Sequence, residues 1–161
     1  MKKDFSKIKL MVCDFDGVMT DNKVIVKEDG SEAVICNRSD GLGIETLKNF
    51  GIGVMVLSKE RSKVVAARCN KLKIGCIFGS DDKLRSLREE VKKRNLSLEQ
   101  VCFIGNDIND IECLKAACIG IAVADSHEKV LEIADIVTKR KGGEGAIREV
   151  CDMLLFYSKR K

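Results

Sequence analysis

The chain has 161 residues, of which 45% are hydrophobic and 34% are charged. This length and balance are typical of one folded globular domain and exclude a disordered chain. The net charge of +4 is small, and no aromatic residues are interleaved in the basic runs at 139–141 and 158–161, so we do not expect a nucleic acid partner.

The first apolar run, residues 8–13, is too short for a membrane span or a signal-peptide core, so we expect no membrane partner. The eight cysteines form no C-x-x-C pair and His127 is the only histidine, which argues against a zinc site. We interpret the cysteines as reduced, structural thiols of a cytoplasmic protein. They stand at positions 13, 36, 69, 76, 102, 113, 118 and 151.

Short apolar runs alternate with amphipathic segments along the chain. The apolar runs are 8–13, 53–57, 76–78, 101–104, 119–123 and 136–138, and the amphipathic segments are 42–50, 62–72, 83–94, 110–117, 128–133 and 146–157. Strands that are apolar throughout are typical of a parallel sheet buried on both faces. The alternation predicts an α/β fold, a three-layer doubly wound parallel sheet, with ligands at the carboxyl ends of the strands. Because proline is absent and no stretch looks like a linker, we expect a single domain over residues 1–161.

One segment interrupts this alternation directly after the first strand. Residues 23–26 and 33–36 are β-like runs around a glycine-containing turn at 28–31, which predicts a β-hairpin inserted at about residues 22–37. Its apolar face has no obvious partner within the domain; the face comprises Val24, Val26, Val34 and Cys36. A hairpin alone is marginal in water, so this one either packs on another subunit or acts as a flap over the site.

Polar residues follow four successive predicted strands at the point where each strand ends. They are Asp14 and Asp16, then Ser58, then Lys83, and finally Asn106, Asp107 and Asp110. Oxygen ligands without histidine or thiolate suit Mg²⁺. A cation and a lysine beside a carboxylate neutralise a phosphate enough for an aspartate to attack it.

Taken singly, each of these residues has a structural explanation. The D-x-D pair is compatible with capping or turn chemistry, and Asp110 with the start of a helix. The prediction of a phosphoryl-transfer site therefore rests on the whole set, which the order of the strands brings to one edge of the sheet.

These motifs resemble those of a known family. The run Asp-Phe-Asp-Gly-Val-Met-Thr-Asp at 14–21 resembles the first motif of the haloacid dehalogenase-like phosphatases, and Ser58, Lys83 and residues 105–110 fall where the other three motifs stand. Over almost its full length the chain resembles the small members without a large cap domain that act on phosphorylated 3-deoxy-2-ulosonic acids. That group includes octulosonate 8-phosphate phosphatases, sialic-acid 9-phosphate phosphatases and the C-terminal domain of some CMP-sialate synthetases. Residues 38–41, 122–127 and 142–149 support the likeness.

The resemblance implies a role for each motif residue. Asp14 would be the nucleophile and a ligand of Mg²⁺. Asp16 would be the general acid and then the base, and its backbone carbonyl would bind the metal. Ser58 and Lys83 would hold phosphate oxygens.

The third metal ligand departs from the family pattern. Most relatives have Gly-Asp-Asp where this chain has Gly105-Asn106-Asp107, so the ligand falls on Asn106. An amide oxygen brings no charge, and either the metal affinity is lower or Asp107 compensates. Asp110 would orient the groups around the metal.

The resemblance also bears on substrate and assembly. This chain resembles the sialic-acid-type members at the positions that bind the sugar acid. Those members have a glutamate at the Glu60 position and basic residues at the Arg68 and Lys71 positions. Octulosonate phosphatases tend instead to carry Gly-Arg at 59–60. A solvated helix face is the alternative for Arg68 and Lys71. The family forms homotetramers in which hairpins meet centrally and one subunit covers the next one's site.

Two further alternatives stay open from the sequence. The glycine-rich segment 142–148 is either an anion-facing loop or a helix cap. The whole chain could instead be a non-catalytic oligomerisation or regulatory module, like the tail domain of CMP-sialate synthetases. Asn106 favours that function, and the intact Asp14 and Asp16 oppose it.

Overall fold

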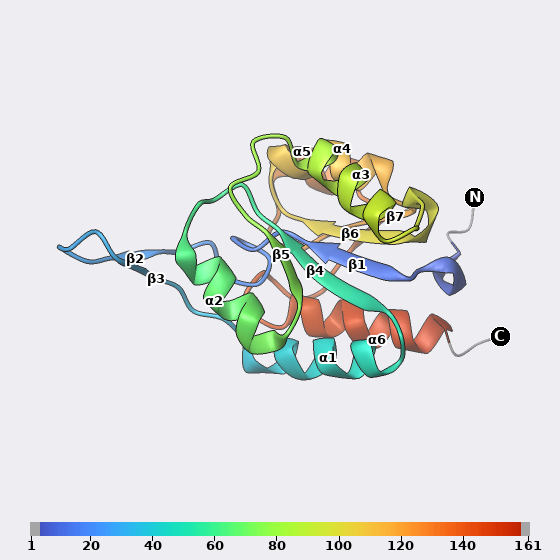
Figure 1. Ribbon diagram of the computed structural model, residues 1–161, viewed down its shortest axis with the longest axis horizontal. Helices are drawn as coiled ribbons and strands as arrows, with labels where there is room; N and C mark the ends of the chain where they lie inside the picture. The colour runs from blue at the N-terminus through green and yellow to red at the C-terminus, as the bar shows by residue number, and fades with distance from the viewer. Residues whose placement is uncertain (1–3, 159–161) are drawn as a thin grey trace.

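The computed structural model describes residues 4–158, and its centre is a six-stranded sheet in which neighbouring strands are parallel. The strand order is β5-β4-β1-β6-β7-β8 (Figure 1). The strands are β1 (Leu10–Cys13), β4 (Gly53–Leu57), β5 (Gly75–Ile77), β6 (Val101–Gly105), β7 (Ile119–Ala122) and β8 (Ile136–Val137). The chain moves outward from β1 to β5 and then returns to the other side of β1. This confirms the predicted doubly wound fold and puts the switch point, where ligands bind in such sheets, beside the end of β1.

Helices cover both faces of the sheet (Figure 1). One layer holds α1 (Arg38–Asn49), α2 (Lys63–Leu72) and α6 (Ala146–Ser158), and the other holds α3 (Lys83–Lys93), α4 (Ile111–Ala116) and α5 (Glu128–Ile133). Short 3₁₀ turns stand at η1 (Phe5–Lys7), η2 (Leu98–Gln100) and η3 (Ile108–Asp110). The sheet therefore lies between two helical layers, as the alternation of segments predicted.

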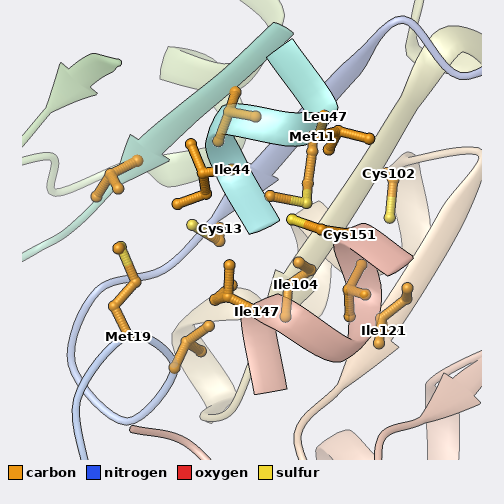
Figure 2. Close-up of a cluster of buried hydrophobic side chains, with 14 of the residues drawn as sticks. Met11, Cys13, Met19, Ile44, Leu47, Cys102, Ile104, Ile121, Ile147 and Cys151 are labelled. Carbon is orange, nitrogen blue, oxygen red and sulfur yellow. The ribbon is translucent and has the colours of Figure 1, made fainter. Parts of the chain in front are cut away.

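The buried strand β1 shows why its residues are apolar throughout. Successive side chains of a strand point to opposite faces. Met11 and Cys13 accordingly join the core beneath α1 and α6, whereas Leu10 and Val12 join the core beneath α3 and α4. Figure 2 shows the first of these cores, where Met11 and Cys13 meet Ile44, Leu47, Ile147 and Cys151. Burying one such side chain fully contributes about 1.5–3 kcal/mol.

The segment after β1 contains a hairpin of β2 (Ile25–Val26) and β3 (Glu32–Ala33), which pair antiparallel. It extends away from the sheet beyond α2 (Figure 1). Val24, Ile25 and Val26 are 51–66% exposed, whereas Val34 and Cys36 pack against the core. The expectation that all four apolar positions of the hairpin face lack a partner is therefore wrong for Val34 and Cys36, because the returning strand already lies against the body of the protein.

Two global features bear on the sequence-based expectations. None of the helices within residues 4–158 combines the length and apolarity needed to cross a bilayer. The cysteines are free thiols, and five of them are buried.

Candidate active site

The loop after β1 carries the first two acidic residues and is closed by local hydrogen bonds. The hydroxyl of Thr20 accepts the backbone N–H groups of Gly17 at 3.1 Å and Asn22 at 3.2 Å. Gly17 has φ +80°, a conformation that favours glycine. Asp14 is 6% exposed, and its Oδ1 accepts the N–H of Phe15 at 2.7 Å. The loop thus holds Asp14 in a fixed orientation at the end of the strand.

Lys83, the first residue of α3, lies between two buried carboxylates. Its Nζ is 2.9 Å from Oδ1 of Asp14 and 2.8 Å from Oδ1 of Asp110. The other oxygen of Asp110 accepts the N–H groups of Asn106 at 3.0 Å and Asp107 at 3.3 Å. Asp110 therefore positions both Lys83 and the turn after β6, which is a more specific role than the one expected from the sequence.

These contacts set the ionisation of the site. Burial, together with the neighbouring Asp110, raises the pKa of Asp14 to about 7, although Lys83 acts in the opposite direction. Burial also raises the pKa of Asp16, with a smaller contribution from Glu60. Although burial lowers the pKa of Lys83, the two carboxylates raise it above its ordinary value. A cation bound beside Asp14 and Asp16 would lower both carboxyl pKa values, because positive charge favours the ionised form.

Asn106 supplies an acceptor that lacks a partner. Its Oδ1 is buried and has no hydrogen bond within the described part of the chain. The amide nitrogen lies against Gly17, where any Cβ would overlap it. A buried acceptor left unpaired costs about 1–3 kcal/mol, which indicates a missing ligand at this point.

The donor set fits Mg²⁺. Asp14, Asp16 and Asn106 line one cavity of about 130 Å³. Across residues 4–158 no three histidine, cysteine, aspartate or glutamate side chains gather into a metal-binding group, and the unpaired amide oxygen of Asn106 is a candidate third donor beside Asp14 and Asp16. Carboxylate and amide oxygens with room for water are the donors that Mg²⁺ prefers.

The same cavity collects most of the other predicted residues. Ser58 and Asp107 line it together with Glu60. Ser58 is 1% exposed, and its hydroxyl accepts the N–H of Glu60 at 3.2 Å. Asp107 is exposed. Its Oδ1 accepts the N–H of Ile108 at 2.7 Å, so its carboxylate caps the start of η3.

Arg68 and Lys71 lie apart from this cavity. Nη2 of Arg68 donates to the carbonyl of Asn37 at 3.1 Å, beside the start of α1, and its Nε is buried without a hydrogen bond in the described residues. Lys71 is exposed. The structure thus brings Glu60 to the site without these two basic residues, and their role in reading the substrate remains a prediction.

Three residues that line the cavity were not singled out from the sequence: Asn22, Lys59 and Asn109. Asn22 has φ +64°, a left-handed conformation that asparagine tolerates better than most residues. The polar run Thr20-Asp21-Asn22, which begins inside the first motif and continues one residue beyond it, is the signal that could have identified it. His127 caps α5 through its Nδ1, which accepts the N–H of Lys129 at 3.2 Å.

The glycine-rich segment after β8 leads directly into α6, where the carbonyl of Gly145 accepts the N–H of Glu149 at 3.0 Å, as expected for a residue that caps a helix. The N–H of Gly142 donates to Asp125 at 2.9 Å, and the N–H of Gly143 donates to the carbonyl of Val18 at 3.1 Å. A Cβ on Gly142 would overlap the carbonyl oxygen of Gly17. These amides are used within the protein, so the segment supports the loop that carries Asp14 and Asp16.

Known proteins resemble this chain in sequence over most of its length. The family model described as a haloacid dehalogenase-like hydrolase matches residues 44–150. The 3-deoxy-D-manno-octulosonate 8-phosphate phosphatase of Yersinia pestis is 38% identical over 93% of this chain and 81% of its own length. The corresponding phosphatase of Escherichia coli strain K12 is 34% identical over 92% of this chain and 79% of its own length.

Solved structures extend the likeness to the whole fold. The Moraxella catarrhalis 3-deoxy-D-manno-octulosonate 8-phosphate phosphatase, in complex with magnesium, phosphate and KDO, has a TM-score of 0.94 at 34% identity, over 97% of this chain and 90% of that one. The cobalt-bound deoxy-D-mannose-octulosonate 8-phosphate phosphatase of Haemophilus influenzae has a TM-score of 0.93 at 32% identity, over 98% and 92% of the two chains.

Proposed function

Because this chain belongs to the haloacid dehalogenase-like hydrolases, we propose that it removes phosphate from a phosphorylated 3-deoxy-2-ulosonic sugar acid through an aspartyl-phosphate on Asp14. One observation carries the proposal. The buried carboxylate of Asp14, bridged to Asp110 by Lys83, lines the same small cavity as the unpartnered oxygen of Asn106. The proposed phosphoryl position thus has the nucleophile Asp14, the ammonium group of Lys83 and the amide oxygen of Asn106 around it.

The metal ligands would be the carboxylate of Asp14, the backbone carbonyl of Asp16 and the amide oxygen of Asn106. Mg²⁺ bound there supplies positive charge that neutralises the phosphate and lowers the cost of bringing it to a carboxylate. Because Asn106 is neutral, the protein contributes less negative charge to this ligand set than an aspartate would.

The carboxylate of Asp14 forms the new bond to phosphorus. Its Oδ1 accepts hydrogen bonds from Phe15 and Lys83, which fix the orientation of the carboxylate. Lys83 and Ser58 hold the phosphate oxygens. The bond from phosphorus to the substrate oxygen breaks, and the leaving alcohol takes its proton from Asp16.

Asp16 then removes a proton from a water molecule, which attacks the phosphoryl group on Asp14 and releases inorganic phosphate. Asp16 returns to its protonated form and Asp14 to a carboxylate, so the cycle closes. The raised pKa of Asp16 supports its use as an acid and then as a base.

The substrate would be an octulosonate 8-phosphate or a sialic-acid-type 9-phosphate. Support for the octulosonate 8-phosphate comes from the relatives, which are octulosonate 8-phosphate phosphatases. Support for the second comes from Glu60, which lines the cavity where those relatives' subfamily tends to carry arginine.

The tail-like, non-catalytic module is less well supported. Asn106 was the feature that favoured it, yet its amide oxygen points to no hydrogen-bond partner in the described residues and is suited to a metal. Asp14 and Lys83 also keep their ion pair at 2.9 Å.

The test is phosphate release from an aryl phosphate, measured with Mg²⁺ and with a chelator. The unmodified protein should turn over only with Mg²⁺, and Asp14→Asn should lose at least about three orders of magnitude in kcat. Asp152→Asn on the exposed side of α6 is the matched control and should stay active. Full activity of Asp14→Asn would exclude the covalent mechanism.

A further inference from the structure

A second cavity of about 260 Å³ adjoins the catalytic one beneath the hairpin. It is called the hairpin cavity here. The two cavities share Asp16, Asn22 and Glu60 in their walls. The two cavities therefore adjoin at these residues, which leaves room for a molecule to occupy both.

The charged groups of the hairpin cavity are mainly acidic. Among the described residues, Asp16, Glu32 and Glu60 line it, against one basic residue, Lys23. The ammonium of Lys23 is 3.1 Å from Asp21, and its side chain is 84% exposed, so much of its charge is already balanced. Glu32 lies on β3 of the hairpin and Glu60 follows β4 of the sheet, so the two carboxylates come to the cavity from different elements.

The remaining walls are apolar or neutral. Val24 and Val34 come from the hairpin, and Val64 and Val65 come from the first turn of α2. Hydroxyl groups can donate to the carboxylates while the C–H faces of a carbon chain lie against the valines. A second anion placed here would meet like charges, which is unfavourable in a partly enclosed site.

We propose that the hairpin cavity binds the uncharged, polyhydroxylated part of the substrate and rejects a carboxylate at that position, with Glu32 as a specificity-determining residue. This inference rests on the proposed function. It implies that the enzyme selects sugar acids by the distance between phosphate and carboxylate. A short acid places its carboxylate inside the cavity, whereas a longer acid carries it past Glu32 and Glu60.

Two six-carbon probes test this directly. Glucitol 6-phosphate and 6-phosphogluconate have the same chain length and differ at the far end, which is a hydroxymethyl group in one and a carboxylate in the other. The unmodified enzyme should hydrolyse glucitol 6-phosphate with the higher kcat/KM. Glu32→Gln and Glu60→Gln should each raise kcat/KM for 6-phosphogluconate relative to glucitol 6-phosphate by about threefold to fivefold, the effect of removing one partly solvated like charge.

Glu28→Gln is the matched control, because Glu28 lies in the exposed turn of the hairpin and lines neither cavity. It should leave the ratio of the two probes unchanged. An aryl phosphate, assayed in parallel with Mg²⁺, distinguishes a failure of the proposed phosphatase function from a failure of the inference about the hairpin cavity. If the aryl phosphate is not hydrolysed, the proposed function fails. If it is hydrolysed but the ratio stays constant in Glu32→Gln, or if the unmodified enzyme prefers 6-phosphogluconate, the inference about the cavity is overturned.

Discussion

Lys83 is the buried cation around which the acidic side chains of the site are arranged. Asp14 and Asp110 are both buried, and each lies within 2.9 Å of its ammonium group. Burying three charges is costly unless they compensate one another, and removing one partner of such a set typically costs about 3–5 kcal/mol. The arrangement therefore couples Lys83 to Asp14 and Asp110, so a change of one of these residues also leaves another buried charge unpaired.

At this scale the sequence predicted residue types better than contacts. Asp14, Asp16, Ser58, Lys83 and Asn106 were identified because they follow strands. The bridge from Lys83 to Asp110 could not be predicted, because it depends on the packing of α3 against the turn after β6. Arg68 could not be placed either, since its partner Asn37 is 31 residues away in the chain.

Asp40 gives a prediction about stability and pH. It is 1% exposed, and burial raises its pKa to about 6, although the N–H of Arg148 donates to it at 2.9 Å. The folded state then holds the proton more tightly than the unfolded state, so the contribution of Asp40 to stability is fully present below about pH 4 and is lost as pH rises through about 6. Relative to Asp40→Asn, the unmodified protein should lose about 2–3 kcal/mol of unfolding free energy across this window.

Urea denaturation of both proteins at several pH values between 4 and 7.5 measures this difference. A constant gap between Asp40→Asn and the unmodified protein would contradict the assignment, because it would mean that Asp40 titrates alike in the folded and unfolded states.

At the scale of elements, the predicted starts of five helices lie within one residue of the observed ones, and the exception is α1. Continuous apolar runs mark buried strands, and the predicted run at 53–57 coincides with β4. The helix predicted at 42–50 instead begins at Arg38, because the side chain of Asn37 accepts the N–H of Ser39 and caps a polar first turn. That turn has no apolar periodicity to reveal it.

The support of the catalytic loop by residues 142–143 leads to a prediction. In Gly142→Ala the new Cβ would push on Gly17, which itself touches the amide of Asn106. The expected result is Mg²⁺ binding weaker by about tenfold or more, as for other groups that support metal ligands. Calorimetric titration with Mg²⁺ measures it.

Gly41→Ala is the control, because the nearest atom to its Cβ is the flexible end of Leu72 at 3.1 Å. Equal Mg²⁺ affinity in Gly142→Ala and the unmodified protein would show that the segment does not hold the loop in place.

At the scale of the whole molecule, the hairpin presents apolar side chains that the rest of residues 4–158 leaves exposed. Val24, Ile25, Val26 and Ile35 are 51–67% exposed. Such a group of residues is typical of an interaction surface. We infer that it joins copies of this chain into a homotetramer, in agreement with the family resemblance.

The double variant Ile25→Ser, Val26→Ser should therefore sediment as a smaller species than the unmodified protein in analytical ultracentrifugation. Val137→Ser, at a 44% exposed position on β8, should leave the assembly unchanged. A monomeric unmodified protein, or an unchanged assembly in the double variant, would contradict this assignment.

The most direct measurement of the central claim is mass spectrometry of the protein after acid quenching during turnover of an aryl phosphate with Mg²⁺. The account predicts one added phosphoryl group, located on the peptide that contains Asp14 and absent from Asp14→Asn. Steady release of phosphate with no phosphoryl group on Asp14, or with one on a different residue, would contradict it.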